Sequence, residues 1–287
     1  MSDHSPEAQS NCVSCAAPLN GPFCSACGER RFDHHALSFK HFVEHAFEAF
    51  THVDGAIFRT LRALAFAPGR LTADWAAGRR KPYMAPVQLF LVMNVLFFIT
   101  QSLNGWNTLT TNLDVHVSST HHREIANAMV KEKLAARAIT YQEYLPAFDA
   151  KAVIQAKSFV IIMVPLLAIV VAILSIGLRR YFIEHMVFSL HFYAFFLFYL
   201  SIANSLASLV LYAMRAAAVT ATDSQIDFVT SLILFASLSI YLAIAVRTVY
   251  RNGRIVSIAK GLALCYLVTN ILYLYRFILF LITFRST

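Results

Sequence analysis

Five long apolar stretches occupy most of the chain beyond residue 82 and predict membrane-spanning helices. Each has about twenty residues that are apolar on every face, which is the length a helix needs to cross a hydrocarbon core of about 30 Å. Pro86 falls in the opening turn of the first stretch, and Pro165 predicts a kink in the second. The pattern indicates an all-α polytopic membrane protein with spans over residues 83–102, 157–178, 186–213, 227–248 and 256–282.

The chain before the first span has a shorter-range pattern and predicts a small polar head. Phenylalanines recur at helical spacing within residues 36–52, which indicates an amphipathic helix. Two further short helices follow, the second with Thr72 as its N-cap and Gly78 just past its C-terminus. The predicted segments are a disordered tail over 1–11, a cysteine module over 12–31 and cytoplasmic juxtamembrane helices over 32–82.

Composition supports a membrane protein. Of the 287 residues, 58% are hydrophobic and only 14% are charged. A soluble domain has roughly 45–50% apolar and about 25% charged residues. The chain is therefore too apolar and too weakly charged to be an ordinary soluble enzyme, and it is not a disordered or disulfide-stapled protein.

Positive charge gathers directly before the first span. Residues 1–58 have a net charge of −4, whereas residues 59–82 have a net charge of +5. Arg79, Arg80 and Lys81 would face anionic lipid headgroups there, and the head offers no basic surface for nucleic acid. No signal-peptide pattern is present at the N-terminus. The distribution of basic residues around the spans predicts a multi-pass protein of the cell (inner) membrane, with the N-terminus in the cytoplasm and the C-terminus outside.

The segment 103–155 is the one long loop between spans and would lie on the outer side. Its pattern predicts a helix over residues 122–138. Thr140 followed by Glu143 matches a capping box at the start of a further helix. Asp149 is expected to cap a helix that leads into the second span.

Four cysteines within sixteen residues form the strongest motif. Cys12 and Cys15 make one Cys-x-x-Cys pair, and Cys24 and Cys27 make another after an eight-residue connector. This spacing in a reducing compartment predicts one structural Zn²⁺ held by four thiolates, with no open coordination position. A thiol-redox pair is the alternative, although it needs only one such motif. Cys265 lies in an apolar stretch and is expected to be a small buried residue.

A histidine stripe on the 36–52 helix offers a second metal hypothesis. His41, Glu44 and His45 match the His-x-x-Glu-His pattern of a zinc enzyme, and His52 extends the same stripe. No third-ligand helix is evident. The polar face of an amphipathic helix explains the same residues, so this stripe stays a weak second-metal candidate.

Polar residues inside or beside the spans are candidates for a membrane site. Glu184 and His185 lie at the inner edge of the third span, and His191 and Asn204 lie within it. A proton or ion path could use them. The alternative is that they make hydrogen bonds between helices, worth about 0.6 kcal/mol each. Three further polar residues in or near spans are Asn94, Asn270 and Arg276. The arginine is expected to lie near the outer interface, where it either snorkels towards water or pairs with Asp227.

Short motifs recur beside the paired cysteines and near the ends of the spans: Phe50-Thr51-His52-Val53-Asp54-Gly55, Arg59-Thr60-Leu61, Pro68-Gly69, Gly78-Arg79-Arg80-Lys81-Pro82-Tyr83 with Pro86, and Glu184-His185-Met186-Val187-Phe188-Ser189-Leu190-His191-Phe192. In this combination the chain resembles a bacterial family of membrane proteins of unknown function with a short N-terminal zinc ribbon. The resemblance covers roughly residues 12–100 and 180–200. Ala16 departs from the glycine usual after a first cysteine pair. The resemblance implies a bacterial inner-membrane protein and supplies no established activity.

The sequence favours a non-enzymatic membrane protein whose cytoplasmic zinc ribbon docks a protein partner or its own helical bundle. A small transporter or channel that uses the polar residues of the third span is the alternative. A membrane-surface enzyme that uses the histidine stripe ranks third, and no motif nominates a catalytic residue.

Overall fold

The computed structural model describes residues 11–29, 31, 55–104, 108–216 and 223–287. Within these ranges the chain is helical, with turns and isolated β-bridges and no extended strand. The helix predicted over 36–52 lies outside them. The helices in chain order are α2 (Ala56–Phe66), α3 (Arg70–Ala76), α4 (Pro86–Asn104), α5 (Leu113–Ser118), α6 (Arg123–Arg137), α7 (Tyr141–Phe159), the 3₁₀ turn η3 (Val160–Ile162), α8 (Met163–Leu174), α9 (Phe182–Ala216), α10 (Asp223–Tyr250) and α11 (Arg254–Ser286).

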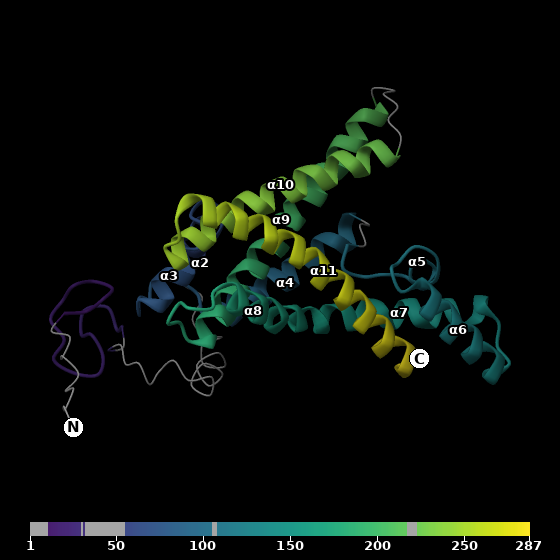
Figure 1. Cartoon of the computed structure of the whole chain (residues 1–287), viewed down its shortest axis with the longest axis horizontal. Coiled ribbons are helices and arrows are strands. Elements are labelled where there is room, and N and C mark those ends of the chain that lie inside the picture. Colours follow the sequence, from purple (N-terminus) through teal and green to yellow (C-terminus); the bar gives the residue numbers. More distant parts are fainter. Residues whose placement is uncertain (1–10, 30, 32–54, 105–107, 217–222) are drawn as a thin grey trace.

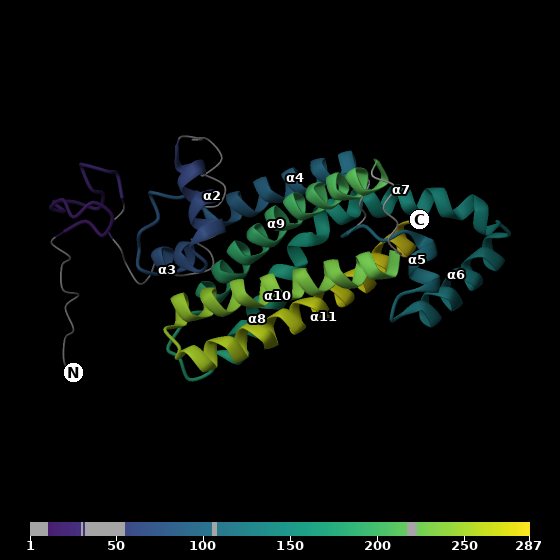
Figure 2. The same ribbon diagram turned by 90° about the horizontal axis from the view of Figure 1, so that it is seen from above.

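Five helical stretches in the described chain are long and apolar enough to cross a membrane, which confirms the predicted fold class. Tight side-chain packing joins them into one bundle: α4 and α8 lie against α9, and α10 pairs with α11 (Figures 1 and 2). Apolar side chains also cover the outward faces, as expected where lipid surrounds a helix. The largest fully buried side chains of the bundle include Leu89, Phe90, Phe97, Leu167, Tyr193 and Tyr275.

The second predicted span is interrupted where the sequence places a proline. The helix that begins at Tyr141 passes through the 3₁₀ turn η3 before α8 continues to Leu174. Pro165 lies in the first turn of α8, where it cannot donate a hydrogen bond to the carbonyl of Ile161. The loss of that bond explains why the regular α-helix breaks over residues 160–162.

The two ends of the bundle differ (Figure 1). At the end called here the α3 end, α3 packs against α9 and α10, close to the cysteine module. At the opposite α6 end, α5, α6 and α7 share a small apolar cluster with the last turns of α11. Lys133 of α6 and Lys151 of α7 donate to main-chain carbonyls of those turns. These contacts satisfy carbonyls that a helix C-terminus leaves unpaired.

Two capping predictions for the α6 end had opposite outcomes. The capping box is confirmed, because the Thr140 hydroxyl accepts from the Glu143 N–H and the Glu143 side chain accepts from the Thr140 N–H. The prediction for Asp149 is wrong. Asp149 lies inside α7, and its Oδ1 accepts from the N–H of Leu113 at 2.8 Å. It therefore caps α5, because the fold brings the start of α5 against the side of α7.

A pair of histidines, the buried His116 and the half-buried His122, connects α5 with the loop that follows it. His116 Nδ1 lies 2.9 Å from His122 Nε2, and His116 packs against Phe148 and Phe280. Burial, together with the nearby His122 and Arg276, lowers the pKa of His116 from 6.5 to about 3. His116 is therefore neutral in the folded protein at neutral pH.

Acidification should loosen the α5 segment. The unfolded segment binds a proton below pH 6.5, whereas folded His116 resists protonation until about pH 3. Stability therefore falls as the pH drops below 6.5, by about 2 kcal/mol at pH 5. Hydrogen exchange of residues 113–118, corrected for intrinsic rates, should speed up about tenfold or more between pH 7 and pH 5. The change should vanish in His116→Gln and persist in His121→Gln, and equal protection at both pH values in the wild type would contradict it.

Candidate metal centre

The cysteine module consists of two turns with the same backbone hydrogen bonds. In each, the first cysteine donates its N–H to the carbonyl five residues later, from Cys12 to Ala17 and from Cys24 to Glu29. The residue four positions later donates back to the same cysteine, and it has a positive φ in both turns. In the second turn this residue is Gly28, which adopts the left-handed region at little energetic cost.

The first turn places Ala16 where the second has glycine. Its φ is +60°, so an alanine adopts a conformation that glycine tolerates better. The sequence departure noted at this position thus leaves the turn geometry intact. The strain is of the order of 1 kcal/mol.

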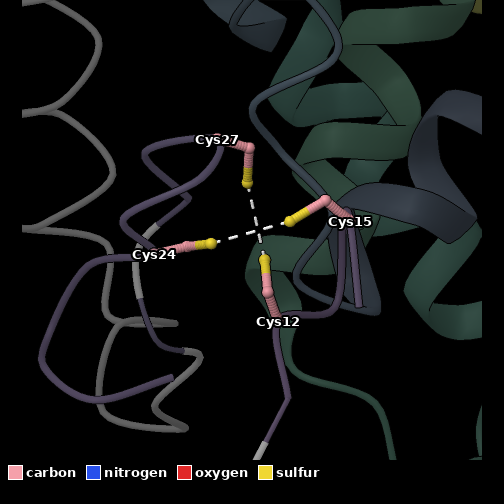
Figure 3. Close-up of side chains that lie close together, drawn as sticks. All are labelled: Cys12, Cys15, Cys24 and Cys27. Carbon is pink, nitrogen blue, oxygen red and sulfur yellow. Dashed lines mark hydrogen bonds between the residues drawn. The ribbon is translucent and has the colours of Figure 1, made fainter. Parts of the chain in front are cut away.

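The four sulfurs of the module converge on one point (Figure 3). Cys12 Sγ lies 3.5 Å from Cys27 Sγ, and Cys15 Sγ lies 3.6 Å from Cys24 Sγ. All four sulfur atoms fall within 4.8 Å of one another and none forms a disulfide. Four sulfurs held tetrahedrally at about 2.3 Å from one ion would be about 3.8 Å apart. The donor set therefore fits a single thiophilic metal ion.

Backbone amides also prepare a sulfur for metal binding. The N–H groups of Cys27 and Ala26 donate to the Cys24 sulfur and lower the pKa of this thiol from 9.0 to about 7. A lowered pKa favours the thiolate, which is the form that binds a metal. The main-chain donors of the second turn thus favour the thiolate of Cys24, whereas burial and the neighbouring sulfurs raise the pKa of Cys27 in the same turn.

Glu29 connects the cysteine module to the helical bundle. Its side chain is 5% exposed, and its Oε2 accepts from the N–H of Arg80 at 3.1 Å and of Lys81 at 2.9 Å. The same oxygen accepts from the hydroxyl of Ser14, in the first cysteine turn, at 2.6 Å. The Glu29 carbonyl accepts from Cys24 N–H. One residue thus contacts both turns of the module and the segment between α3 and α4.

That segment, residues 77–85, is named the juxtamembrane loop. Buried Asp74 of α3 accepts from Arg79 Nε at 3.1 Å and from the Tyr83 hydroxyl at 3.0 Å. Thr60 of α2 accepts from the N–H of Met84 at 3.0 Å. Contacts from α2 and α3 therefore fix the loop before α4 begins.

The start and end of α3 test two sequence predictions. Gly78 ends the helix as predicted: its φ is +85°, its N–H donates to Trp75, and the N–H of Arg79 donates to Asp74. The N-cap prediction for Thr72 is wrong, because Gly69 holds that position. Thr72 lies within α3, where its side chain is free to contact another helix.

Thr72 contacts His191, one of the polar residues predicted for a membrane site in the third span. Thr72 Oγ1 lies 2.9 Å from Nδ1 of His191, and both residues are buried. His185, also on α9, places its Nδ1 2.8 Å from the Tyr250 hydroxyl of α10. Both histidines therefore join α9 to a neighbouring helix at the α3 end.

The other two candidates of this span have separate partners. Glu184 pairs with Arg180 at 2.6 Å, one helical turn away. Asn204 donates to Thr108 Oγ1 at 3.2 Å, towards the α6 end. Hydrogen bonds thus tie the four predicted residues to four different neighbours and do not assemble them into one cluster.

The three further polar residues predicted in or near the spans, Asn94, Asn270 and Arg276, also have protein partners. Asn94 donates to the Lys157 carbonyl and connects α4 to α7, whereas Asn270 donates to Tyr266 within its own helix. Arg276 donates to the Thr108 carbonyl at 2.9 Å. The side chain of Asp227, its predicted partner, lies outside the described structure. Cys265 is buried as expected.

The second metal candidate cannot be placed. His41, Glu44, His45 and His52 all lie outside the described residues. Among the residues that are described, the four cysteines form the one cluster of three or more metal-ligating side chains. The histidine stripe therefore stays a prediction.

A comparison with protein families gives one match, over residues 54–98. The matching model describes a protein of unknown function (DUF3667). The matched segment contains α2, α3, the juxtamembrane loop and most of α4. It therefore includes the internal contacts of Asp74 and Thr60 and the two amides that bind Glu29. Searches of curated proteins and of solved structures found no match.

Sequence reasoning missed Glu29 as a functional residue. An acid two residues after the second cysteine pair is its only local signal, and that signal does not identify a partner. The partner amides lie 51 and 52 residues further along the chain. Only the folded chain brings the carboxylate and these amides together.

Proposed function

We propose that the protein is a non-enzymatic integral membrane protein whose cysteine module binds one structural zinc ion and docks on its own juxtamembrane loop. The module, with the bound ion, is the zinc ribbon of the proposal. Docking takes place at the cytoplasmic face of the inner membrane. The ribbon holds the loop and α3 against the helical bundle and offers a surface for a cytoplasmic protein partner.

The observation that carries this proposal is the buried carboxylate of Glu29 between module and loop. A buried charge is costly unless it is hydrogen-bonded, and charge-assisted bonds are stronger than neutral ones. Two of its three bonds reach the loop, from Arg80 and Lys81. The contact is therefore specific rather than incidental.

Zinc is the metal that best suits the donor set. Four thiolates with tetrahedral spacing favour Zn²⁺ over harder ions that prefer oxygen ligands. All four positions are filled by protein, so the ion has no site for substrate. A module with so small a core depends on the ion for its folding free energy.

The distribution of charge supports the cytoplasmic position of this end. At the α3 end, Arg180 precedes α9 and donates to the carbonyl of Val249 in the last turn of α10. The start of α9 and the end of α10 therefore lie at the same end of the bundle. Basic residues are enriched in cytoplasmic loops. The basic residues that flank the spans at this end include Arg79, Arg80, Lys81, Arg179, Arg180, Arg247, Arg251, Arg254 and Lys260.

A transporter that uses Glu184, His185, His191 and Asn204 has less support. Each of these side chains has a hydrogen-bonding partner in the protein, and no shared cluster joins them. Hydrogen bonds between helices account for the contacts of His185 and His191, and Asn204 bonds to the loop between α4 and α5.

Replacing Glu29 tests the docking. In Glu29→Ala the amides of Arg80 and Lys81 lose their shared acceptor, and we expect their hydrogen exchange to accelerate about tenfold or more. Zinc content should remain one ion per chain, because no ligand is changed. The matched control is Glu124→Ala, which removes the same charge from an exposed position on α6. Exchange rates equal to wild type in Glu29→Ala would contradict the docking.

A further inference from the structure

We propose that the juxtamembrane loop contains a phosphate-binding site, formed by the main-chain amides of Arg80 and Lys81, that Glu29 occupies in this structure. The inference rests on the proposed docking of the cysteine module. In this proposal Glu29 competes with phosphate, because its carboxylate occupies the site until the cysteine module leaves the loop.

The first support is the geometry of the two amides. Consecutive N–H groups of Arg80 and Lys81 donate to one and the same oxygen, Glu29 Oε2, at 3.1 and 2.9 Å. Successive main-chain amides that converge on one point make an anion-binding concavity. A carboxylate already bound there shows that the position accepts an anionic oxygen. A phosphate oxygen has the same hydrogen-bonding requirement.

The second support is the charge around the two amides. A Cβ atom placed on Gly28 would lie 3.6 Å from the Lys81 ammonium, so this cation lies beside the residue that precedes Glu29. The Arg80 guanidinium lies 4.3 Å over the ring of Trp75, so this side chain of the loop packs against α3. Among the described residues, Asp74 is the acid paired with Arg79. Removing Glu29 would take one negative charge from a loop that contains Arg79, Arg80 and Lys81, and would take from the two amides the acceptor that they share here.

The third support is the position of the loop in the chain. It leads directly into α4, a helix long and apolar enough to cross a membrane from Pro86 onward. Under the proposed topology, amides five and six residues before such a helix lie at the depth of lipid headgroups. An anionic phospholipid is therefore the nearest source of phosphate, and free inorganic phosphate is the other.

The state of the cysteine module would control access to the site. Glu29 is held in place by both cysteine turns, through the Ser14 hydroxyl and the Cys24 N–H. Both turns depend on the metal for their fold. Loss of the ion would release the carboxylate and expose the amides to a phosphate group.

The experiment uses purified full-length protein in detergent and follows hydrogen exchange at Arg80 and Lys81. Wild type, Glu29→Ala and Glu124→Ala are each measured alone, with phosphatidylglycerol, with phosphatidylcholine and with inorganic phosphate. We expect phosphatidylglycerol to slow exchange at both amides at least threefold in Glu29→Ala and to leave wild type and Glu124→Ala unchanged. Adding Lys81→Ala to Glu29→Ala should reduce this protection. Zinc content of one ion per chain confirms that each variant has kept its module.

The outcomes separate the two proposals and the two sources. Fast exchange in Glu29→Ala that neither phosphatidylglycerol nor inorganic phosphate slows would overturn the phosphate site and leave the docking intact. Exchange in Glu29→Ala no faster than in wild type would contradict the docking itself. Protection by phosphatidylglycerol alone identifies a lipid headgroup as the ligand, and equal protection by inorganic phosphate identifies the free ion. Phosphatidylcholine carries the same phosphate together with a compensating ammonium, so equal protection by this lipid would show that the loop does not select an anionic headgroup and would overturn the assignment to an anionic phospholipid.

Discussion

The Cys24→Ser/Cys27→Ser variant is expected to contain no zinc, whereas the wild type should contain one ion per chain. Two serines leave only Cys12 and Cys15, and two thiolates cannot close a tetrahedral site. Structural zinc sites of this kind contribute roughly 10–16 kcal/mol of binding free energy at neutral pH, and that energy folds the module. The measurement is elemental analysis of detergent-purified protein, with Cys265→Ser as the control because it removes a cysteine remote from the site.

The same variant should keep its helical bundle. The apolar core of the bundle is built from residues of α2, α3, α4 and α7 to α11 and includes none from the cysteine module. The far-ultraviolet circular dichroism spectrum should therefore change little, whereas the amides of residues 11–29 should lose their protection from hydrogen exchange. Retention of one zinc ion by the double variant would contradict the site.

Zinc stoichiometry also tests the histidine stripe. Two zinc ions in the wild type, with one surviving the double substitution, would indicate a second metal held by residues such as His41, Glu44 and His45. The enzyme hypothesis, ranked last on the sequence, would then move to first place.

Gly261→Leu is expected to destabilise the helical bundle strongly. Gly261 of α11 lies against Ala243 of α10, and a Cβ atom at Gly261 would be 2.7 Å from both the Cβ and the main-chain nitrogen of Ala243. Small residues allow membrane helices to approach this closely. A leucine must push the two helices apart, and we expect a loss of about 3 kcal/mol or more in the free energy of unfolding.

Thermal unfolding in detergent measures this effect. Gly253→Ala is the matched control, because an added Cβ there has no neighbour within 4 Å and the backbone has a φ of −60°. Gly261→Ala should fall between the control and Gly261→Leu. If Gly261→Leu unfolds at the same temperature as Gly253→Ala, the close approach of α10 and α11 is not what holds them together.

Features that depend on near neighbours in the chain were predictable from the sequence. Apolar runs predicted the five membrane-type helices, and Pro165 predicted the break before α8. Gly78 predicted the end of α3, and Thr140 with Glu143 predicted a capping box. The spacing of the cysteines predicted that their sulfurs would meet. Each signal works because the interacting groups lie within a few residues and the covalent chain fixes their geometry.

The tertiary structure alone decided which distant side chains pair. Asp149 caps α5 across 36 residues instead of capping a helix of its own, and Thr72 reaches His191 across 119 residues. Glu29 meets the juxtamembrane loop more than fifty residues away. Sequence patterns show that such polar groups need partners, because burying them unpaired is costly. Which partner each one finds depends on how the helices pack, and that follows from side-chain shape over the whole bundle rather than from spacing along the chain.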